Sequence, residues 1–235
     1  MIAAAAAVAL VAAALAAPQH GGADRTEVIG HSRQGRSIVA RELGDAHARR
    51  SVLVVGSIHG NETQGLRVVD RLRHHSRRLR RSDLWTIETV NPDRVAAGTR
   101  GNARGVDLNR NFATGWKPIP PSSGYYSGPK PFSEPETRAV RRFLRRLRPD
   151  VTIWYHQPFG RTLIPCNRRG RKVALRYARL SGLRARDCYP TPPGAATGWE
   201  DAALHEKAFV AEFGPGALSR SQVRRHARAV LRIAG

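Results

Sequence analysis

The sequence predicts a single α/β domain: a mixed, mostly parallel open sheet with helices on both faces. Its length of 235 residues suits one domain with a sizeable core. Hydrophobic residues make up 41% of the chain and no long polar tract interrupts them, so the body should be globular. Short apolar runs alternate with segments of helical periodicity, which is typical of a parallel sheet covered by helices.

Each element is predicted from local patterns of apolar residues. Strands are expected near 26–30, 37–42, 51–58, 85–91, 150–156, 161–165 and 207–213. Helices are expected near 62–80, 134–148, 168–181 and 219–233. In the second helix, Val140, Phe143, Leu144 and Leu147 follow i, i+3, i+4, i+7 spacing and form one apolar face. The connection 92–132 is rich in Gly, Pro, Asn and Arg, and loops of that length are usually functional.

The first seventeen residues differ from the rest of the chain. Residues 1–17 are apolar and uncharged, and end in the small-residue pattern Ala14-Leu15-Ala16. This predicts a signal peptide over 1–17, a domain over 24–235, and an exported protein (secreted, periplasmic or cell-wall associated). No Lys or Arg precedes the run, so an uncleaved anchor, a misassigned start codon and an alanine-rich helix of the fold stay open. The run is short for a membrane span, so no stable membrane insertion is expected.

The chain is strongly basic, with a formal net charge of +22, and arginine supplies all but four of its 40 basic residues. Such a charge favours a polyanionic partner. The alternative is that arginines cover the solvent-facing sides of the helices, as they do around the apolar face of 134–148. No aromatic residues for base stacking interleave with the basic clusters, so we expect no specific nucleic-acid partner.

Two cysteines are present, Cys166 and Cys188. In an exported protein they could form one disulfide, and two buried free thiols are the alternative. Their spacing fits no metal-binding motif.

Three residues at the ends of predicted strands have the chemistry of metal ligands. The apolar run "SVLVVG" leads into "SIHGNE", which places His59 and Glu62 at a strand end and a helix start. The strand "DVTIWYHQP" ends at His156. Ligands of open α/β sheets bind outside the carboxyl ends of the strands. Two histidines and one glutamate with an open fourth position form a catalytic zinc arrangement.

A fourth residue could supply a base. Glu212 lies near the end of the apolar strand "KAFVAEFGPG", where a carboxylate needs a reason to be buried. Zinc lowers the pKa of a bound water to about 7, and a carboxylate can then take the proton. A structural ion pair of Glu212 is the alternative.

At this point the chain resembles the zinc carboxypeptidase family, the carboxypeptidase A-like enzymes. The motifs "HGNE", "TRGNARGVDLNRNF", "SGPKPFSEPE", "WYHQP" and "VAEFGPG" occur in family order over nearly the whole chain after residue 24. The resemblance implies one Zn²⁺ per chain held by His59, Glu62 and His156, with Glu212 as the general base. It also implies that Arg100 polarises the scissile carbonyl, because its guanidinium is always charged.

The same resemblance assigns residues around the zinc site. Asn109 and Arg110 resemble the pair that binds the terminal carboxylate of the substrate, Arg110 in bidentate fashion. Asp107 resembles the aspartate that orients the first histidine ligand. Tyr189 lies one residue before the expected position of the closing tyrosine of the family, so it is a substrate-binding candidate or a packing residue. Thr197 lies where the family reads the substrate side chain.

Two further expectations follow from the resemblance. The family has cis peptide bonds after the last histidine ligand and after the catalytic glutamate, so Gln157–Pro158 and Gly214–Pro215 are both predicted to be cis. Glu200 and Asp201, near Thr197, could favour a cationic substrate side chain, although carboxylates are common at helix starts.

The predicted activity is hydrolysis of the C-terminal amide bond of peptides by a monomeric zinc metallocarboxypeptidase. The alternative is a murein peptide amidase that cleaves the γ-D-glutamyl–diaminopimelate bond, because the loop "YPTPPGAATGWED" resembles that of compact bacterial relatives. Either substrate is a peptide with a free C-terminal carboxylate. An N-acyl amino acid deacylase and a non-catalytic basic binding domain are further alternatives.

Overall fold

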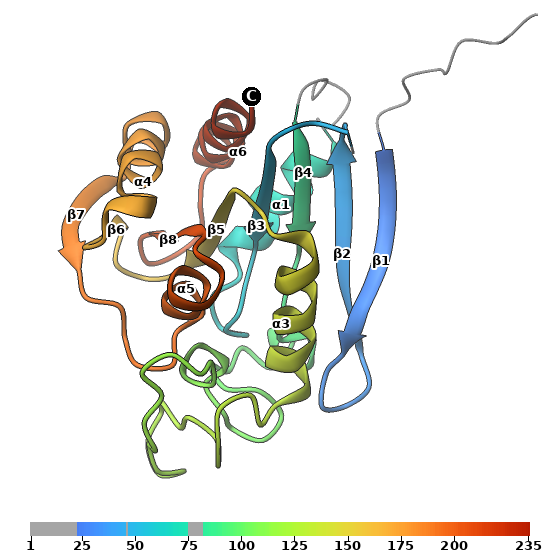
Figure 1. The fold of residues 1–235 in the computed structure, drawn as a ribbon, viewed down its shortest axis with the longest axis vertical. Helices are drawn as coiled ribbons and strands as arrows, with labels where there is room; N and C mark the ends of the chain where they lie inside the picture. The colour runs from blue at the N-terminus through green and yellow to red at the C-terminus, as the bar shows by residue number, and fades with distance from the viewer. Residues whose placement is uncertain (1–22, 46, 75–81) are drawn as a thin grey trace, which may run out of the picture.

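The structure is a computed structural model, and it describes residues 23–45, 47–74 and 82–235. Its centre is an eight-stranded sheet in the order β1-β2-β4-β3-β5-β8-β6-β7 (Figure 1). The strands are β1 (Ala23–His31), β2 (Ser37–Gly44), β3 (Ser51–Val55), β4 (Asp83–Ile87), β5 (Val151–His156), β6 (Arg161–Pro165), β7 (Arg184–Tyr189) and β8 (Lys207–Glu212). The predicted fold class, a mixed open sheet in one α/β domain, is confirmed.

The described residues also form six α-helices and two short helical turns. They are α1 (Gln64–Arg73), α2 (Pro92–Val95), η2 (Leu108–Arg110), α3 (Pro135–Leu147), α4 (Arg168–Ser181), α5 (Ala196–Trp199), η3 (Glu200–Leu204) and α6 (Arg220–Ala234). The predicted helix 62–80 corresponds to α1, which starts at Gln64, and residues 75–80 of the prediction lie outside the described residues. The predicted signal peptide, residues 1–17, also lies outside them.

The middle of the sheet is parallel and its edges are mixed. β4, β3, β5 and β8 run parallel to one another, whereas β2 pairs antiparallel with β4 and β6 pairs antiparallel with β8. The carboxyl ends of the parallel strands therefore meet at one edge. In Figure 1 this edge faces downward, toward the long connection between α2 and α3.

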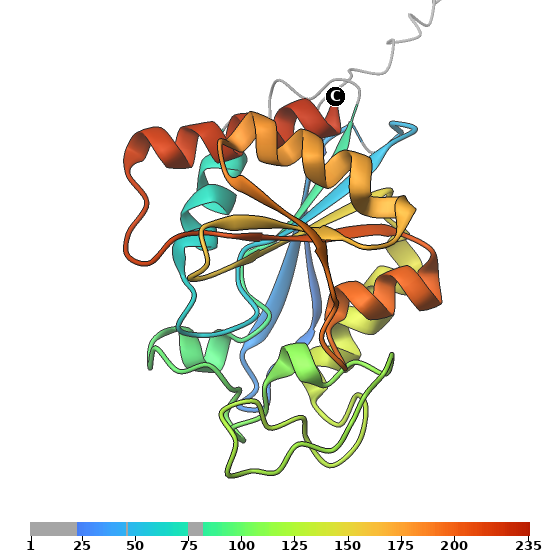
Figure 2. The ribbon, with the colours of Figure 1, turned by 90° about the vertical axis from the view of Figure 1, so that its left-hand side faces the viewer.

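Helices cover both faces of the sheet, as predicted (Figure 2). One core packs α1, α4 and α6 against the sheet around Tyr155, Tyr177 and Phe209. The other packs α3 and α5 around Phe112, Trp154 and Phe143. Burying each such side chain stabilises the fold by about 1.5–3 kcal/mol, so the apolar stripes identified in the sequence fix which side of each helix faces inward.

The elements that the sequence did not predict include β7 and the short helices α2 and α5. β7 reads "RARDCY" and is exposed along most of its length, so it has no apolar pattern. It pairs with β6, and a disulfide joins its Cys188 to Cys166, the residue after β6. The helices α2 and α5 are four residues long, too short for a periodic signal.

One of the two cis-peptide predictions is confirmed and the other is wrong. Gln157–Pro158 is cis, whereas Gly214–Pro215 is not. The two isomers of an X–Pro bond differ by only about 0.5–1 kcal/mol, so proline permits the cis form without requiring it.

No helix in the described part of the chain is both long and apolar enough to cross a membrane.

Candidate metal centre and active site

The turn after β3 presents two of the predicted metal ligands. β3 ends at Val55, and the carbonyl of His59 accepts a hydrogen bond from the Glu62 amide at 3.1 Å. Two glycines bring this turn against α1, since a Cβ on Gly65 would lie 1.9 Å from the carbonyl oxygen of Gly56. Glycine permits this close backbone approach, which holds Glu62 beside the strand end.

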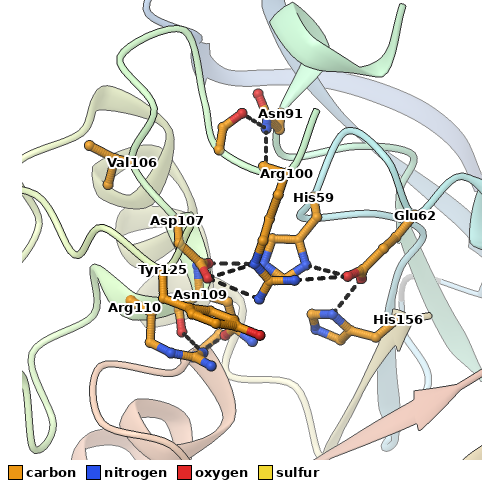
Figure 3. A network of polar contacts seen from close by, with 12 residues as sticks. His59, Glu62, Asn91, Arg100, Val106, Asp107, Asn109, Arg110, Tyr125 and His156 are labelled. Atoms are coloured by element: carbon orange, nitrogen blue, oxygen red, sulfur yellow. Dashed lines mark hydrogen bonds and ion pairs between the residues drawn. The ribbon is translucent and has the colours of Figure 1, made fainter. Parts of the chain in front are cut away.

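His59, Glu62 and His156 form one buried cluster, although 93 residues separate Glu62 from His156 in the sequence. Their ligand atoms all lie within 4.8 Å of one another. Nδ1 of His156 lies 2.8 Å from one carboxylate oxygen of Glu62, and Nδ1 of His59 lies 2.9 Å from the other (Figure 3). The three residues could therefore hold one metal ion.

The donor atoms of this cluster fit a zinc ion. Nδ1 of His59 is buried and lies 2.9 Å from Oε1 of Glu62, and no hydrogen bond satisfies it. Nε2 of the same ring lies 2.9 Å from Oδ1 of Asp107. A proton on Nε2 leaves the lone pair of Nδ1 free for a metal. Two imidazole nitrogens and a carboxylate, with a position left open, are the ligands of catalytic zinc.

Asp107 connects the cluster to the loop beside it. Oδ1 contacts His59 and also accepts a hydrogen bond from the Asn109 amide, at 2.9 Å in each case. Oδ2 accepts a hydrogen bond from Nε of Arg100, also at 2.9 Å. Arg100 reaches further, and its Nη1 donates to Oε1 of Glu62 at 3.1 Å. One carboxylate thus fixes the orientation of His59, Arg100 and the start of η2.

Neighbouring charges determine the protonation of this cluster. Burial alone lowers the pKa of His59, but Asp107 and Glu62 outweigh it and raise that pKa above its usual value. Burial alone raises the pKa of Glu62, but His156 and His59 hold it well below the usual range. His59 and two arginines lower the pKa of Asp107 in the same way, against burial. Both carboxylates are therefore ionised at neutral pH, as ligation and imidazole orientation require.

Glu212 faces the same edge of the sheet. It ends β8, and its register partner on the neighbouring strand β5 is His156. The side chain is 6% exposed, and its Oε2 makes no hydrogen bond. Burial is the main reason that the pKa of Glu212 is raised; His156 opposes this shift and Glu62 adds to it. A buried carboxylate with a free oxygen and a raised pKa suits proton transfer.

A cavity of about 560 Å³ opens beside the cluster. All predicted site residues except Asp107 line it: His59, Glu62, Arg100, Asn109, Arg110, His156, Tyr189, Thr197 and Glu212. Asp107 lies behind His59 and is fully buried. The structure therefore brings together residues that come from the turn after β3, from β5, β7, β8 and α5, and from the long connection.

Asn109 and Arg110 lie on η2 with their polar groups available to the cavity. Oδ1 of Asn109 accepts a hydrogen bond from the Ala196 amide at 2.9 Å, so its NH₂ group is left as the donor toward a ligand. Nη1 of Arg110 donates to the Asn109 carbonyl at 2.8 Å. No carboxylate within the described ranges forms a salt bridge with Arg110, which leaves its guanidinium suited to an incoming carboxylate.

The structure gives Tyr189 and Thr197 positions on the cavity wall, but it excludes the predicted role of two neighbouring carboxylates. Glu200 is fully buried, and its Oε1 accepts a hydrogen bond from Nε1 of Trp154 at 2.6 Å. Asp201 pairs with Arg169. Neither lines the cavity, so the expectation that they favour a cationic substrate side chain is wrong. The turn into η3 points Glu200 toward the core instead.

Two aromatic residues at the cavity were missed in the sequence. Tyr125 and Phe159 line the cavity and are 51% and 57% exposed, unlike most large apolar side chains of the described chain. Both lie in loops without periodicity, so the only available signal was their position beside the predicted site motifs.

Comparison with known proteins assigns the chain to a family. A zinc carboxypeptidase family model matches residues 13–165, more than half of the sequence, so the chain belongs to the zinc carboxypeptidase family. The resemblance stated from the motifs is therefore confirmed.

Two curated relatives illustrate the range within the family. Murein peptide amidase A of Escherichia coli K12 is 34% identical over 148 residues, which cover 56% of this chain and 60% of the relative. Carboxypeptidase B of Astacus astacus is 28% identical over 143 residues, which cover 49% of this chain and 47% of the relative. The matched region thus spans about half to three fifths of each relative.

Solved structures show the same architecture. The murein-tripeptide amidase of Escherichia coli O157 superposes with a TM-score of 0.68 and 27% identity, covering 89% of this chain and 90% of that one. Carboxypeptidase A of Helicoverpa armigera superposes with a TM-score of 0.75 over 90% of this chain and 68% of that one. At 19% identity, the second similarity shows the fold alone.

Proposed function

We propose that the protein is a zinc-dependent hydrolase that releases the C-terminal residue of a peptide with a free terminal carboxylate. The observation that carries this proposal is the placement of Glu212, with an unpaired carboxylate oxygen, beside the buried cluster of His59, Glu62 and His156. Amide hydrolysis needs metal ligands, a base and positively charged groups in one place, and here they share one cavity.

Each residue has a defined part in this proposal. Zinc held by the cluster supplies Lewis-acid polarisation and lowers the pKa of water. Glu212 takes a proton from the attacking water and passes it to the leaving nitrogen. Arg100, oriented by Asp107 and Glu62, stabilises negative charge on the carbonyl oxygen as water attacks.

Asn109 and Arg110 supply the recognition of the terminal carboxylate in this proposal. The NH₂ group of Asn109 and the guanidinium of Arg110 are both donors at the cavity, and neither is committed to another carboxylate. This pair orients the substrate so that its last amide bond lies toward Glu212.

A murein peptide is the second candidate substrate, and the comparisons favour it. The two amidases named above are relatives by sequence and by structure, and one of them matches nearly the whole chain. Among the described residues, Glu62 and Glu212 are the carboxylates that line the cavity, while Asn167, Thr191 and Thr197 offer neutral polar groups. This lining suits a polar, zwitterionic side chain such as that of diaminopimelate.

We also infer that the protein is exported. The disulfide between Cys166 and Cys188 supports this, because disulfides persist in oxidising compartments. Fractionation of cells that carry the full chain, with N-terminal sequencing of the mature protein, would test both export and cleavage after residue 16 or 17. A cytoplasmic protein with reduced thiols would contradict it.

The first experiment compares two substrates, each with and without a chelator. Purified, zinc-loaded protein is incubated with N-blocked peptides that differ at the last residue, and with L-Ala-γ-D-Glu-diaminopimelate. Chelator-sensitive release of diaminopimelate alone identifies a murein peptide amidase, whereas release of ordinary C-terminal residues identifies a carboxypeptidase. No release from either substrate contradicts the proposal, and tests on N-acyl amino acids and on salt-dependent polyanion binding would follow.

The second experiment tests the assigned base. Glu212→Gln should lower kcat by about 10²–10⁴-fold, because the side-chain amide of glutamine cannot accept the proton. The zinc content should stay near one per chain. Glu88→Gln, at an exposed glutamate that does not line the cavity, is the matched control and should leave kcat unchanged. Turnover by Glu212→Gln at the rate of the unmodified protein would exclude this mechanism.

A further inference from the structure

Tyr125 is placed where it touches both arginines of the candidate site. Its ring centroid lies 4.9 Å from the guanidinium carbon of Arg100 and 5.3 Å from that of Arg110. Figure 3 shows the ring beside both side chains. Contacts of this length between a cation and an aromatic face are attractive, and the attraction grows when water is excluded.

The two arginines depend on this ring to different degrees. Arg100 is already held by Asp107 and Glu62. In the part of the chain that the structure describes, Arg110 makes one hydrogen bond, to the carbonyl of Asn109, and its guanidinium faces the ring of Tyr125. Its attraction to the buried Asp107 carboxylate acts without a hydrogen bond or salt bridge. A long arginine side chain with so few partners loses considerable rotamer freedom when it binds an anion. Because the ring of Tyr125 already restricts the guanidinium of Arg110, less rotamer freedom is left to lose when the anion binds.

The backbone around Tyr125 is fixed to the metal site. The Tyr125 amide donates to Oγ of Ser123 at 3.1 Å, and the carbonyl of the next residue, Tyr126, accepts from the Asp107 amide at 2.7 Å. Beyond it, Nδ2 of Asn111 donates to the carbonyl of Ser127 at 2.8 Å. The loop therefore has a defined register relative to η2, although the ring itself is half exposed.

We propose that Tyr125 is a positioning residue that acts through Arg110, and to a smaller extent Arg100, to set the affinity for the substrate carboxylate. The inference rests on the proposed function, because it assigns Arg110 to carboxylate binding. It explains why a large aromatic side chain is kept half exposed at the mouth of the cavity, where its apolar surface would otherwise face water.

The test measures binding of a simple carboxylate, benzoate, by calorimetry, so that it does not depend on hydrolysis. Zinc-loaded Tyr125→Leu should bind benzoate roughly three- to thirty-fold more weakly, which is the fold-change expected from losing a cation–π contact. Tyr125→Phe retains the ring and should bind within about two-fold of the unmodified protein. Tyr126→Leu, in the same loop but outside the cavity lining, should bind normally.

A double-mutant cycle separates positioning from a general loss of structure. In an Arg110→Ala background, Tyr125→Leu should have little further effect, because the residue through which it acts is gone. Equal losses in both backgrounds, or a loss in Tyr125→Phe as large as in Tyr125→Leu, would overturn the proposal. On an active substrate, Tyr125→Leu should raise KM with kcat nearly unchanged. Benzoate binding with these dependences in a protein that hydrolyses nothing would contradict the proposed function alone.

Discussion

At the scale of single residues, Asp107 determines much of the candidate site. One carboxylate contacts the imidazole of His59, the guanidinium of Arg100 and the amide of Asn109. Because it is fully buried, these contacts are not shared with water. Asp107 thus couples the orientation of His59, Arg100 and Asn109, although its own side chain does not line the cavity.

We predict that Asp107→Asn weakens zinc binding by about 10–100-fold, as is typical when the partner of a histidine ligand is removed. The amide keeps the shape of the carboxylate but loses the charge that orients and polarises His59. Competition with a chromophoric chelator measures the affinity. Asp70→Asn, at an exposed aspartate on α1, is the matched control and should bind zinc normally. Unchanged affinity in Asp107→Asn would contradict this account.

At the scale of elements, the close contact between α1 and the turn after β3 positions Glu62. We predict that Gly65→Ala destabilises the protein by about 1–3 kcal/mol or more, because the added Cβ would meet the Gly56 carbonyl and the side chain of Tyr155. Urea unfolding measures this, and zinc affinity should fall with it. Gly124→Ala, where an added Cβ meets nothing, is the control. Normal stability and zinc affinity in Gly65→Ala would show that the turn can shift freely.

The disulfide between β6 and β7 fixes a different part of the site. Cys166 is flanked by Pro165 and Asn167, and Cys188 is followed by Tyr189; these three neighbours all line the cavity. Both cysteines are exposed, so a reductant can reach them. The bond therefore ties one wall of the cavity together without touching the metal ligands in the turn after β3 and at the end of β5.

We predict that replacing both cysteines by serine raises KM several-fold while the zinc content and kcat change little. The wall would loosen, but His59 and Glu62 lie in the turn after β3, and His156 and Glu212 end β5 and β8. The same change should lower the free energy of unfolding by about 2–4 kcal/mol, since the bond closes a loop across 22 residues. Kinetics on an active substrate, with zinc analysis in parallel, measures this. A loss of zinc together with the disulfide would contradict it.

At the scale of the whole molecule, two buried carboxyl groups away from the cavity make stability depend on pH. Burial raises the pKa of Glu200 to about 7, and burial with the nearby Glu200 raises the pKa of Glu206 to about 8. Their ordinary value is 4.5. Between these values the folded chain binds more protons than the unfolded chain, so these two groups lower stability as pH rises through this window.

We predict that Glu200→Gln is more stable than the unmodified protein at pH 8, by about 1–3 kcal/mol, and differs little at pH 4.5. Glutamine cannot ionise, and its oxygen can still accept the hydrogen bond from Trp154. Unfolding free energies at the two pH values measure the difference, with Glu88→Gln as an exposed control. A variant that is less stable at pH 8 by the same amount as at pH 4.5 would contradict the assigned pKa.

The sequence predicted the sheet, four of the helices and the metal cluster because these depend on local patterns. Apolar runs identify buried strands, and a histidine or glutamate at the end of such a run has few explanations other than chemistry. Tyr125 and β7 were missed because their roles come from contacts made in three dimensions, with two arginines and with a disulfide. Glu200 was assigned wrongly for the same reason: Thr197, three residues earlier, lines the cavity, while the side chain of Glu200 faces Trp154.

The pairing of His156 with Glu212 has a consequence for how proteins of this architecture can diverge. The two residues are register partners on adjacent strands, so the sheet alone sets their separation. The fifty or so residues that connect them include the disulfide-linked wall. This segment can gain or lose length at exposed turns without changing the distance between His156 and Glu212. Natural selection can therefore remodel which substrates enter while the hydrolytic chemistry is inherited unchanged.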